Sequence, residues 1–292
     1  MAKSLADGLP RLPEALMNNC LASLDKVGFT AGMAFESHGV RIGVRVTDPS
    51  VLDDVVARLP TGWKRRRARR VEHLASLIVG DRERRGNIRR LHLVYSGAIR
   101  AFRSTDLDEA LAFLERHLEE YVAQQSPERI FVHAGVVAWK GKAIVIPGSS
   151  HSGKTSLVAA LLAAGATYYS DEYAVLDARG HVHPYARPLR IRDADDLGRR
   201  VTHEALGARA GRAALPVGLV AATRFDADAR WRPRRLSRGE TTLELLSHTV
   251  PARFRPRQAL RVLDAVSRGA IALKGRRGEA AGMAQSILEA VE

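Results

Sequence analysis

The sequence has very little cysteine and no long apolar segment. A single cysteine, Cys20, in 292 residues excludes a disulfide scaffold and a zinc site built from cysteines, and it is typical of a reducing cytoplasm. Nowhere do 18 apolar residues follow one another, and the first residues lack the apolar stretch of a signal peptide. We therefore expect a cytoplasmic protein that does not cross or bind a membrane.

Acidic residues are also scarce relative to basic ones, 32 against 46, which gives a formal net charge of +14. Residues 58–103 hold fourteen Lys or Arg but only three Asp or Glu. Such a segment can attract an acidic peptide or protein, or the phosphates of nucleic acid, and it can equally be an ordinary solvated surface. Because no aromatic residues interrupt the run of basic residues at 64–70, the pattern argues against nucleic acid.

The most informative segment present follows the apolar residues 143–146. It reads G-x-x-x-x-G-K-T and comprises Gly148, Ser149, Ser150, His151, Ser152, Gly153, Lys154 and Thr155. This is the phosphate-binding P-loop pattern, and it stands between a predicted buried strand and a predicted helix over 156–166. The glycines allow backbone N–H groups to approach phosphate oxygens, Lys154 can reach the terminal phosphates, and Thr155 can ligate Mg²⁺. The loop predicts binding of ATP with Mg²⁺.

The rest of the chain divides near residue 125. Residues 1–125 are predicted to form a small α+β domain that serves as an accessory or substrate-recognition unit. Its expected elements are a hairpin over 32–47, a short helix after Pro49, strands over 71–79 and 90–103, and a helix over 107–125 capped by Asp106. Residues 126–292 are predicted to form an α/β catalytic domain with a mixed sheet. Its expected strands cover 130–139, 143–146 and 217–225, with a strand or hairpin over 181–192 and a mostly helical segment over 256–292.

An acidic pair, Asp171 and Glu172, follows Lys154 by seventeen and eighteen residues, between two short apolar runs. In a phosphoryl-transfer site one carboxylate holds Mg²⁺, and a second group orients or deprotonates the attacking hydroxyl. The spacing after the P-loop helix favours these two roles over a solvated acidic turn. Asp171, Glu172 and Thr155 are therefore the expected metal ligands. His133, on the strand before the P-loop strand, is a further candidate, although a lone histidine in an apolar strand is more often a core residue.

The segment 132–177, VHAGVVAWKGKAIVIPGSSHSGKTSLVAALLAAGATYYSDEYAVLD, resembles the catalytic core of the bacterial HPr kinase/phosphorylase family. It is more distantly similar to the nucleotide site of ATP-dependent phosphoenolpyruvate carboxykinases. The resemblance covers residues 130–192 well and the remainder to 292 in outline. It implies a kinase that transfers a phosphoryl group from ATP to a serine hydroxyl. It also implies that Asp171 is the general base or the group that orients the hydroxyl, that His133 supports it, that Lys154 binds phosphates and that Thr155 binds Mg²⁺.

The chain departs from the family pattern at several points. Glu172 stands where the family has a second Asp, and the family's Glu-x-Arg-Gly segment has no clean counterpart. Arg187, Arg190 and Arg192 stand there instead, and Arg190 is the residue we expect to contact phosphate. The first 125 residues differ from those of the sugar-regulating enzymes, so neither the phosphorolytic reaction nor HPr as substrate is implied. Shortened relatives resemble kinases of peptide-modification systems, including kinases of lasso-peptide precursors.

Three functions remain open from the sequence. The first is a serine kinase acting on a protein or peptide, such as an acidic precursor peptide docked on the basic N-terminal half. The second is a P-loop kinase or carboxykinase-like enzyme with a small-molecule substrate. The third is a nucleotide-binding regulator without turnover. The sequence leaves the acceptor, the nucleotide preference and the presence of a homo-oligomer undetermined.

Overall fold

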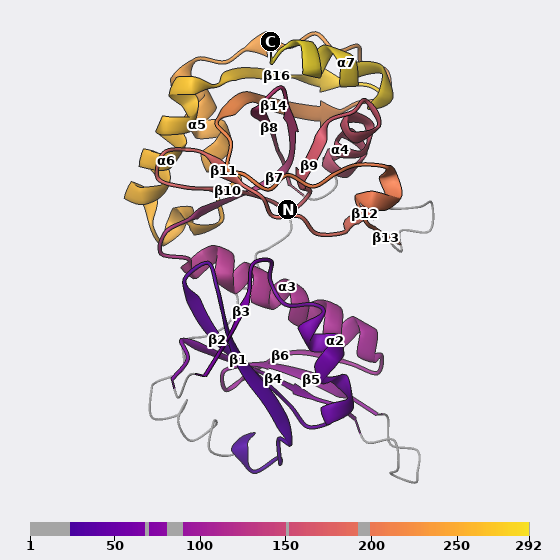
Figure 1. The fold of residues 1–292 in the computed structure, drawn as a ribbon, viewed down its shortest axis with the longest axis vertical. Coiled ribbons are helices and arrows are strands. Elements are labelled where there is room, and N and C mark those ends of the chain that lie inside the picture. The colour runs from indigo at the N-terminus through magenta and orange to yellow at the C-terminus, as the bar shows by residue number, and fades with distance from the viewer. Residues whose placement is uncertain (1–23, 68–69, 81–89, 150–151, 192–198, 292) are drawn as a thin grey trace. The chain divides into compact units, whose positions relative to one another are not determined.

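The computed structural model describes residues 24–67, 70–80, 90–149, 152–191 and 199–291 (Figure 1). The chain forms two compact units, which divide after Pro127. Both units combine helices with a mixed sheet, so the protein belongs to the mixed α/β class. None of the helices within the described residues is long and apolar enough to cross a bilayer.

The first unit is built on a six-stranded sheet with the order β3-β1-β2-β4-β5-β6, in which only β2 and β4 pair in parallel. The strands are β1 (Ala31–Ser37), β2 (Val40–Val46), β3 (Lys64–Arg66), β4 (His73–Ile78), β5 (His92–Ser96) and β6 (Ile99–Ser104). The predicted hairpin over 32–47 is confirmed as β1 and β2. Its two turn residues, His38 and Gly39, both adopt positive φ, as a tight hairpin requires.

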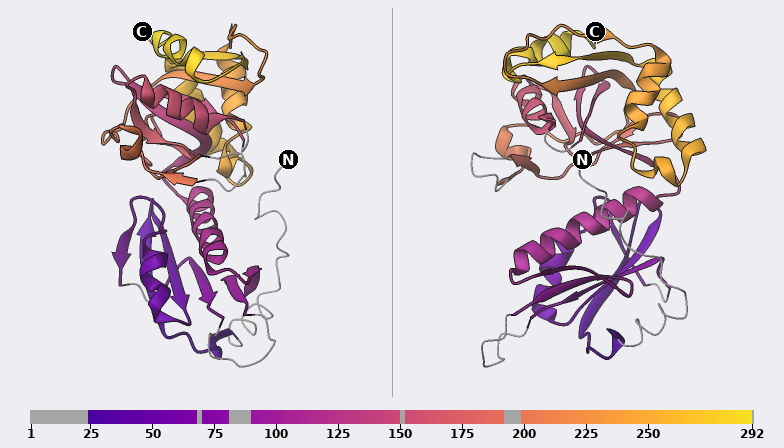
Figure 2. Two further views of the ribbon diagram at one scale, coloured as in Figure 1. Left: turned by 90° about the vertical axis from the view of Figure 1, so that its right-hand side faces the viewer. Right: turned by 180° about the vertical axis from the view of Figure 1, so that it is seen from behind.

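Two helical segments complete this unit. Pro49 opens the 3₁₀ turn Pro49–Val51, which continues into α2 (Leu52–Val56). The helix α3 (Leu107–Gln125) begins at Asp106, whose carboxylate accepts hydrogen bonds from the N–H groups of Asp108 and Glu109, as predicted. Figure 2 shows α3 along one face of the sheet, where it contacts β4, β5 and β6. Apolar side chains at helical spacing fill this contact: Leu111, Leu114, Leu118 and Val122.

The basic run of the sequence includes an edge strand that the sequence did not predict. Lys64, Arg65 and Arg66 form β3, which pairs with β1, and all three side chains are exposed. Arg66 forms an ion pair with Glu36 on β1 at 3.2 Å. Charged side chains on an edge strand discourage unwanted pairing with other chains. This segment is therefore ordered backbone with solvated side chains, and its role in docking an acidic peptide stays a prediction.

Two histidines meet between β4 and α3. The Nε2 atoms of His73 and His117 lie 3.2 Å apart, and the ring of His73 stacks on Tyr121 with centroids 4.1 Å apart. Burial lowers the pKa of His73 to about 3, with the neighbouring His117 adding to the shift, and burial also lowers the pKa of His117. At neutral pH one neutral ring therefore donates its N–H to the other.

This pair predicts that acid destabilises the first unit. When the pH falls below the ordinary histidine pKa of 6.5, both histidines of the unfolded chain bind protons, whereas the buried pair of the folded protein stays neutral. Stability is therefore complete above pH 6.5 and is lost as the pH falls toward 3. We expect protection of α3 from hydrogen exchange, corrected for intrinsic rates, to fall by at least tenfold between pH 7 and pH 5. The double substitution His73→Leu/His117→Leu should remove most of that dependence, while His181→Leu in the other unit should not. Equal acid sensitivity in the double variant would contradict this account.

The second unit is built on an eight-stranded mixed sheet with the order β11-β10-β7-β8-β14-β16-β15, to which β9 adds by pairing with β7. The strands are β7 (Ile130–Trp139), β8 (Lys142–Pro147), β9 (Thr167–Ser170), β10 (Tyr173–Leu176), β11 (Val182–His183), β14 (Val217–Phe225), β15 (Arg234–Arg235) and β16 (Ile271–Arg277). The predicted strands over 130–139, 143–146 and 217–225 are confirmed. A separate pair, β12 (Leu189–Ile191) and β13 (Arg199–Val201), lies off this sheet.

Helices cover both faces of the sheet (Figure 1). They are α4 (Lys154–Ala163) and α7 (Ala281–Glu289) on one face, and α5 (Arg238–Leu246) and α6 (Pro256–Gly269) on the other. Alternation along β8 divides its apolar side chains between the two cores: Ile144 and Ile146 pack with α4 and α7, and Ala143 and Val145 pack on the α6 side. This sandwich explains why AIVI is apolar throughout.

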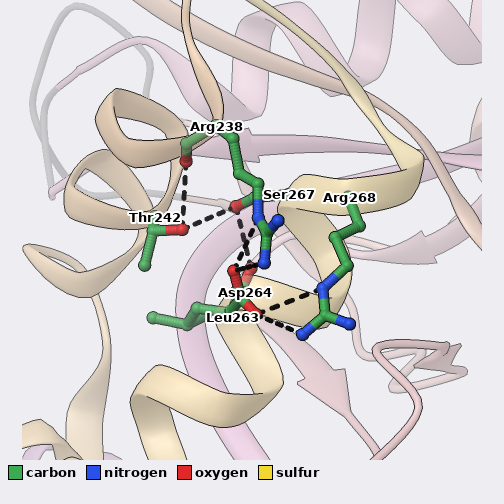
Figure 3. Close-up of polar contacts among 6 residues, drawn as sticks. All are labelled: Arg238, Thr242, Leu263, Asp264, Ser267 and Arg268. Atoms are coloured by element: carbon green, nitrogen blue, oxygen red, sulfur yellow. Dashed lines mark hydrogen bonds and ion pairs between the residues drawn. The ribbon is translucent and has the colours of Figure 1, made fainter.

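Polar contacts join α5 to α6 (Figure 3). The Thr242 hydroxyl donates to Ser267 Oγ at 3.0 Å, and the Arg238 guanidinium donates to Asp264 at 2.7 Å. Arg268 pairs with the same carboxylate from one helical turn away. Because these charges are solvent-exposed, they set the register of the two helices more than they stabilise them.

One prediction in this unit is wrong, and one strand was not predicted. Residues 181–192 do not form one strand or hairpin, because β11 pairs with β10 while β12 pairs with β13. The segment 256–292 is mostly helical, as predicted, through α6 and α7, but the strand β16 lies between these helices and pairs in parallel with β14. The basic residues of β16 interrupt its apolar pattern, which hid this strand.

Candidate functional site

The P-loop lies at the carboxyl edge of three parallel strands. β8 pairs in parallel with β14, and β14 pairs in parallel with β16, so the ends of all three strands meet at one edge. Gly148 directly follows β8, and α4 begins at Lys154. Ligands of open α/β sheets bind in this position, beyond the carboxyl ends of the strands. The strand, loop and helix that the sequence predicted are therefore present in the predicted order.

The two glycines of the loop are required by close contacts. A Cβ at Gly148 would lie 2.5 Å from Ser152 Oγ, and Gly153 adopts φ +82°, a conformation that favours glycine. The Gly148 N–H donates to the carbonyl of His133 at 3.2 Å, so this group holds the loop to β7 and does not face a ligand. Ser150 and His151, which the sequence assigned to the same site, lie outside the described residues.

Polar groups inside the loop are left available for an anion. The Lys154 ammonium donates to the carbonyls of Gly148 and Ser149 at 2.8 and 2.9 Å, so it lies over the loop. The Ser152 hydroxyl is buried and has no hydrogen-bond partner among the described residues. Together with the N-terminus of α4, these donors have the chemistry that binds phosphate oxygens. The residues present therefore fit a polyphosphate.

The acidic pair is brought to the P-loop by the turn between β9 and β10. The Thr155 hydroxyl donates to Asp171 Oδ2 at 2.7 Å, across sixteen residues of sequence. The other oxygen, Oδ1, is buried and has no hydrogen-bond partner among the described residues. It lies 3.8 Å from the position that a Cβ would occupy on Gly135, where any side chain would collide with Val158 of α4. The absence of a side chain at Gly135 thus leaves room for Val158 of α4, which packs on the same strand beside Asp171.

Asp171 is the most perturbed carboxylate at this edge. Burial raises the pKa of Asp171 to about 7, and the negative charge of Glu172 adds to the rise. The hydrogen bond from Thr155 and the positive charge of Lys154 act in the opposite direction. A carboxylate that titrates near neutral pH is suited to accept a proton from a hydroxyl, and its free oxygen is suited to a metal ion.

Glu172 lies next to Asp171 but faces differently. Its side chain is exposed, and its backbone carbonyl accepts a hydrogen bond from the Ala134 N–H at 3.2 Å. The residue is therefore anchored by its backbone, while its carboxylate is free to move. Burial lowers the pKa of Lys154, and the negative charge of Glu172 partly opposes that shift, while the same charge adds to the raised pKa of Asp171. Metal binding by Glu172 stays a prediction.

His133 lies at this edge beside residues that the sequence did not connect to it. Its ring centroid is 4.9 Å from that of Tyr173, and the backbone N–H of His133 donates to the backbone carbonyl of His248 at 2.8 Å. Although the side chain is partly accessible, the surrounding protein lowers the pKa of His133 to about 4 by desolvation, and the charges of Lys154 and His248 add to this shift. No hydrogen bond of the described residues joins it to Asp171, so its supporting role stays a prediction.

The sequence missed two residues of this region. His248 follows α5 in an ordinary stretch of sequence, and nothing local distinguishes it. Arg277 ends β16, is 1% exposed, and donates to the carbonyl of Gly153 at 2.7 Å. Only recognition of β16 as a strand parallel to β14 would have placed Arg277 at the P-loop edge.

The sequence predicted that an arginine among Arg187, Arg190 and Arg192 contacts phosphate. Arg190 lies on β12, which packs near α4, and its Cα pairs with that of Arg200 on β13. The carbonyl of Arg187 accepts a hydrogen bond from the Tyr168 hydroxyl at 2.7 Å, which gives this residue a structural role. Arg192 lies outside the described residues. Phosphate binding by Arg190 stays a prediction.

A metal ion at this edge would need ligands beyond the protein. Among the described residues, no cluster of three His, Cys, Asp or Glu side chains could hold a metal. Thr155 and Asp171 together offer a hydroxyl and a carboxylate. Mg²⁺ commonly takes one or two such protein ligands and completes its octahedron with water and phosphate oxygens. The two residues therefore fit a Mg²⁺ ion that arrives with a nucleotide.

In comparisons with known proteins, no protein-family model and no curated protein matches this chain. The likeness to HPr kinases is the sequence resemblance described above, which covers residues 130–192 and continues to residue 292 in outline.

Proposed function

We propose that this chain is an ATP- and Mg²⁺-dependent kinase that transfers a phosphoryl group to a serine hydroxyl of a protein or peptide. The observation that carries the proposal is the 2.7 Å hydrogen bond between Thr155 and Asp171. It joins a phosphate-binding loop to a buried carboxylate with a pKa near neutrality. A protein that only bound nucleotide would have no need of such a base.

Each residue of the site has a role in phosphoryl transfer that follows from its chemistry. The loop N–H groups, the Lys154 ammonium and the Ser152 hydroxyl bind the phosphates of ATP. Thr155 and Asp171 are the protein ligands for Mg²⁺, which neutralises phosphate charge when bound. Asp171, with Glu172 beside it, orients the serine hydroxyl and takes its proton. The serine oxygen then bonds to the γ-phosphorus, the bond from that phosphorus to the β–γ bridging oxygen breaks, and ADP leaves.

The acceptor is expected to be acidic around its serine or in its docking segment. The first unit carries exposed Lys64, Arg65 and Arg66 on the edge strand β3, and such a strand attracts acidic chains at low ionic strength. This proposal locates the protein in the cytoplasm, where ATP is available.

The test is transfer of label from γ-³²P-ATP. The full chain is incubated with Mg²⁺, labelled ATP, and the small proteins and peptides encoded beside its gene, each with a matched Ser→Ala version. We expect label on a peptide serine, identified by mass spectrometry, and none on the Ala version. Label in a small molecule would instead favour the second candidate function. Nucleotide binding without transfer to any acceptor would favour a regulator and would overturn the kinase proposal.

A further inference from the structure

Arg277 is the largest side chain that is almost completely buried in the described part of the chain. It ends β16, the strand next to β14 and two strands from the P-loop strand β8. An arginine is rarely buried unless its charge is paired with a carboxylate or with a bound anion. Its surroundings therefore indicate what it is for.

The guanidinium contacts the P-loop directly. Its Nη2 donates to the carbonyl of Gly153 at 2.7 Å, and the Leu157 N–H donates to the same carbonyl at 3.2 Å. A Cβ at position 153 would lie 2.3 Å from Nη2. Gly153 is thus a glycine for two reasons, its positive φ and the approach of Arg277. Arg277 and the second glycine of the motif are therefore in direct contact, although 124 residues separate them in the sequence.

This contact sets the orientation of the peptide group between Gly153 and Lys154. In a trans peptide the C=O and the following N–H point in opposite directions. Because Arg277 and Leu157 hold the Gly153 carbonyl, the Lys154 N–H is turned away from the guanidinium. That N–H is the first of the unpaired donors at the N-terminus of α4, the group that anions bind.

The positive charge of Arg277 has no carboxylate partner among the described residues. Nη1 donates to the carbonyl of Gly278 at 2.9 Å, and Nε is buried and has no hydrogen-bond partner within the described part of the chain. The guanidinium carbon lies 5.4 Å from the centroid of the Phe225 ring. The negative charge that acts on the guanidinium comes from Glu279, whose side chain is exposed. A buried cation bonded only to carbonyls is costly, and a polyphosphate on the adjoining loop would offset that cost.

We infer that Arg277 is a positioning residue of the P-loop, which orients the first turn of α4 and supplies a fixed positive charge that a bound polyphosphate neutralises. The inference rests on the proposed nucleotide site but not on phosphoryl transfer. It adds to the site a residue outside the motif. Arg276 provides a matched control, because it is the adjacent residue of the same strand, is exposed, and pairs with Asp226 at 3.1 Å.

The test measures binding of inorganic tripolyphosphate and of ATP by calorimetry at several salt concentrations. Arg277→Gln should bind both at least tenfold more weakly, with a smaller dependence of log Kd on log salt. Arg277→Lys should recover part of the loss, because the charge remains while the forked contact is gone. Arg276→Gln should bind as the wild type does. Thermal unfolding of each ligand-free variant is recorded beside the binding data.

A second measurement serves if Arg277→Gln fails to fold. In the wild-type protein, the buried Arg277 Nε–H should give a resolved nitrogen NMR signal that shifts when tripolyphosphate is added. A folded Arg277→Gln variant that binds tripolyphosphate as tightly as the wild type would overturn this inference alone, and so would an Nε signal that does not move. A wild-type protein that binds neither ligand would overturn both this inference and the proposed function.

Discussion

Replacing Asp171 with Asn is expected to lower phosphoryl transfer by about 10²–10⁴-fold, the range typical of a lost general base. The Asn carbonyl oxygen can still accept the hydrogen bond that Thr155 donates to Asp171 at 2.7 Å, so the loop should keep its shape. Nucleotide affinity measured without Mg²⁺ should therefore change by less than about threefold. Single-turnover transfer and equilibrium binding of ATP separate the two effects. Glu289→Gln, an exposed carboxylate on α7, serves as the control.

The pH dependence gives this prediction a second measurement. The pKa of Asp171 is raised to about 7, chiefly by burial, so the base is ionised only above neutrality. The kcat/KM of the wild type, which reports the free enzyme, should fall as the pH drops through about 7, and this step should be absent from the residual kcat/KM of Asp171→Asn. An unchanged rate in the variant, with the same pH profile, would remove Asp171 from the mechanism.

The raised pKa of Asp171 also predicts that Asp171→Asn stabilises the ligand-free protein at alkaline pH. Between about pH 4 and pH 7 the folded protein keeps a proton on Asp171 that the unfolded chain has released, so stability falls as the pH rises through this window. Above pH 7 the buried charge costs on the order of a few kcal/mol. Asp171→Asn should therefore raise the melting temperature of the ligand-free protein at pH 8 but not at pH 4.

Replacing Lys154 with Ala is expected to weaken ATP binding by about 10–100-fold. A charge-assisted hydrogen bond contributes roughly 1.5–3 kcal/mol, and 1.4 kcal/mol corresponds to a factor of ten in affinity. Lys154 now donates to the carbonyls of Gly148 and Ser149, so its ammonium already lies over the loop that would hold the phosphates. Lys142→Ala, at the opposite end of β8, should leave the affinity unchanged.

The Lys154→Ala substitution should also change the pKa of His133 in the absence of nucleotide. The positive charge of Lys154 contributes, after desolvation, to the lowering of the His133 pKa to about 4. Removing that charge should raise the pKa of His133, which NMR titration of the imidazole measures directly. A variant that binds ATP normally and leaves the His133 titration unchanged would show that Lys154 lies away from both the phosphates and the histidine.

Local signals predicted most of the elements well. The P-loop motif requires glycines, a preceding buried strand and a following helix, and β8 and α4 stand at those places. Asp106 was recognisable as a cap because its short carboxylate can bond the first free N–H groups of α3. Periodicity failed for β16, whose ALKGRR pattern has no clean alternation, and for 181–192, where adjoining short strands join different sheets.

The sequence by itself determined the glycine-containing loop of the P-loop motif, the strand before it and the helix after it, and the presence of an acidic pair beyond them. These depend on backbone conformation and spacing, which neighbouring residues dictate. Only the tertiary structure decided that Asp171 accepts a hydrogen bond from the Thr155 hydroxyl while the Glu172 side chain is exposed to solvent. Only it decided that Arg277 lies buried against Gly153, because that contact depends on which strands pair in the sheet. Pairing between distant strands follows from the packing of the whole core, and no short stretch of sequence records it.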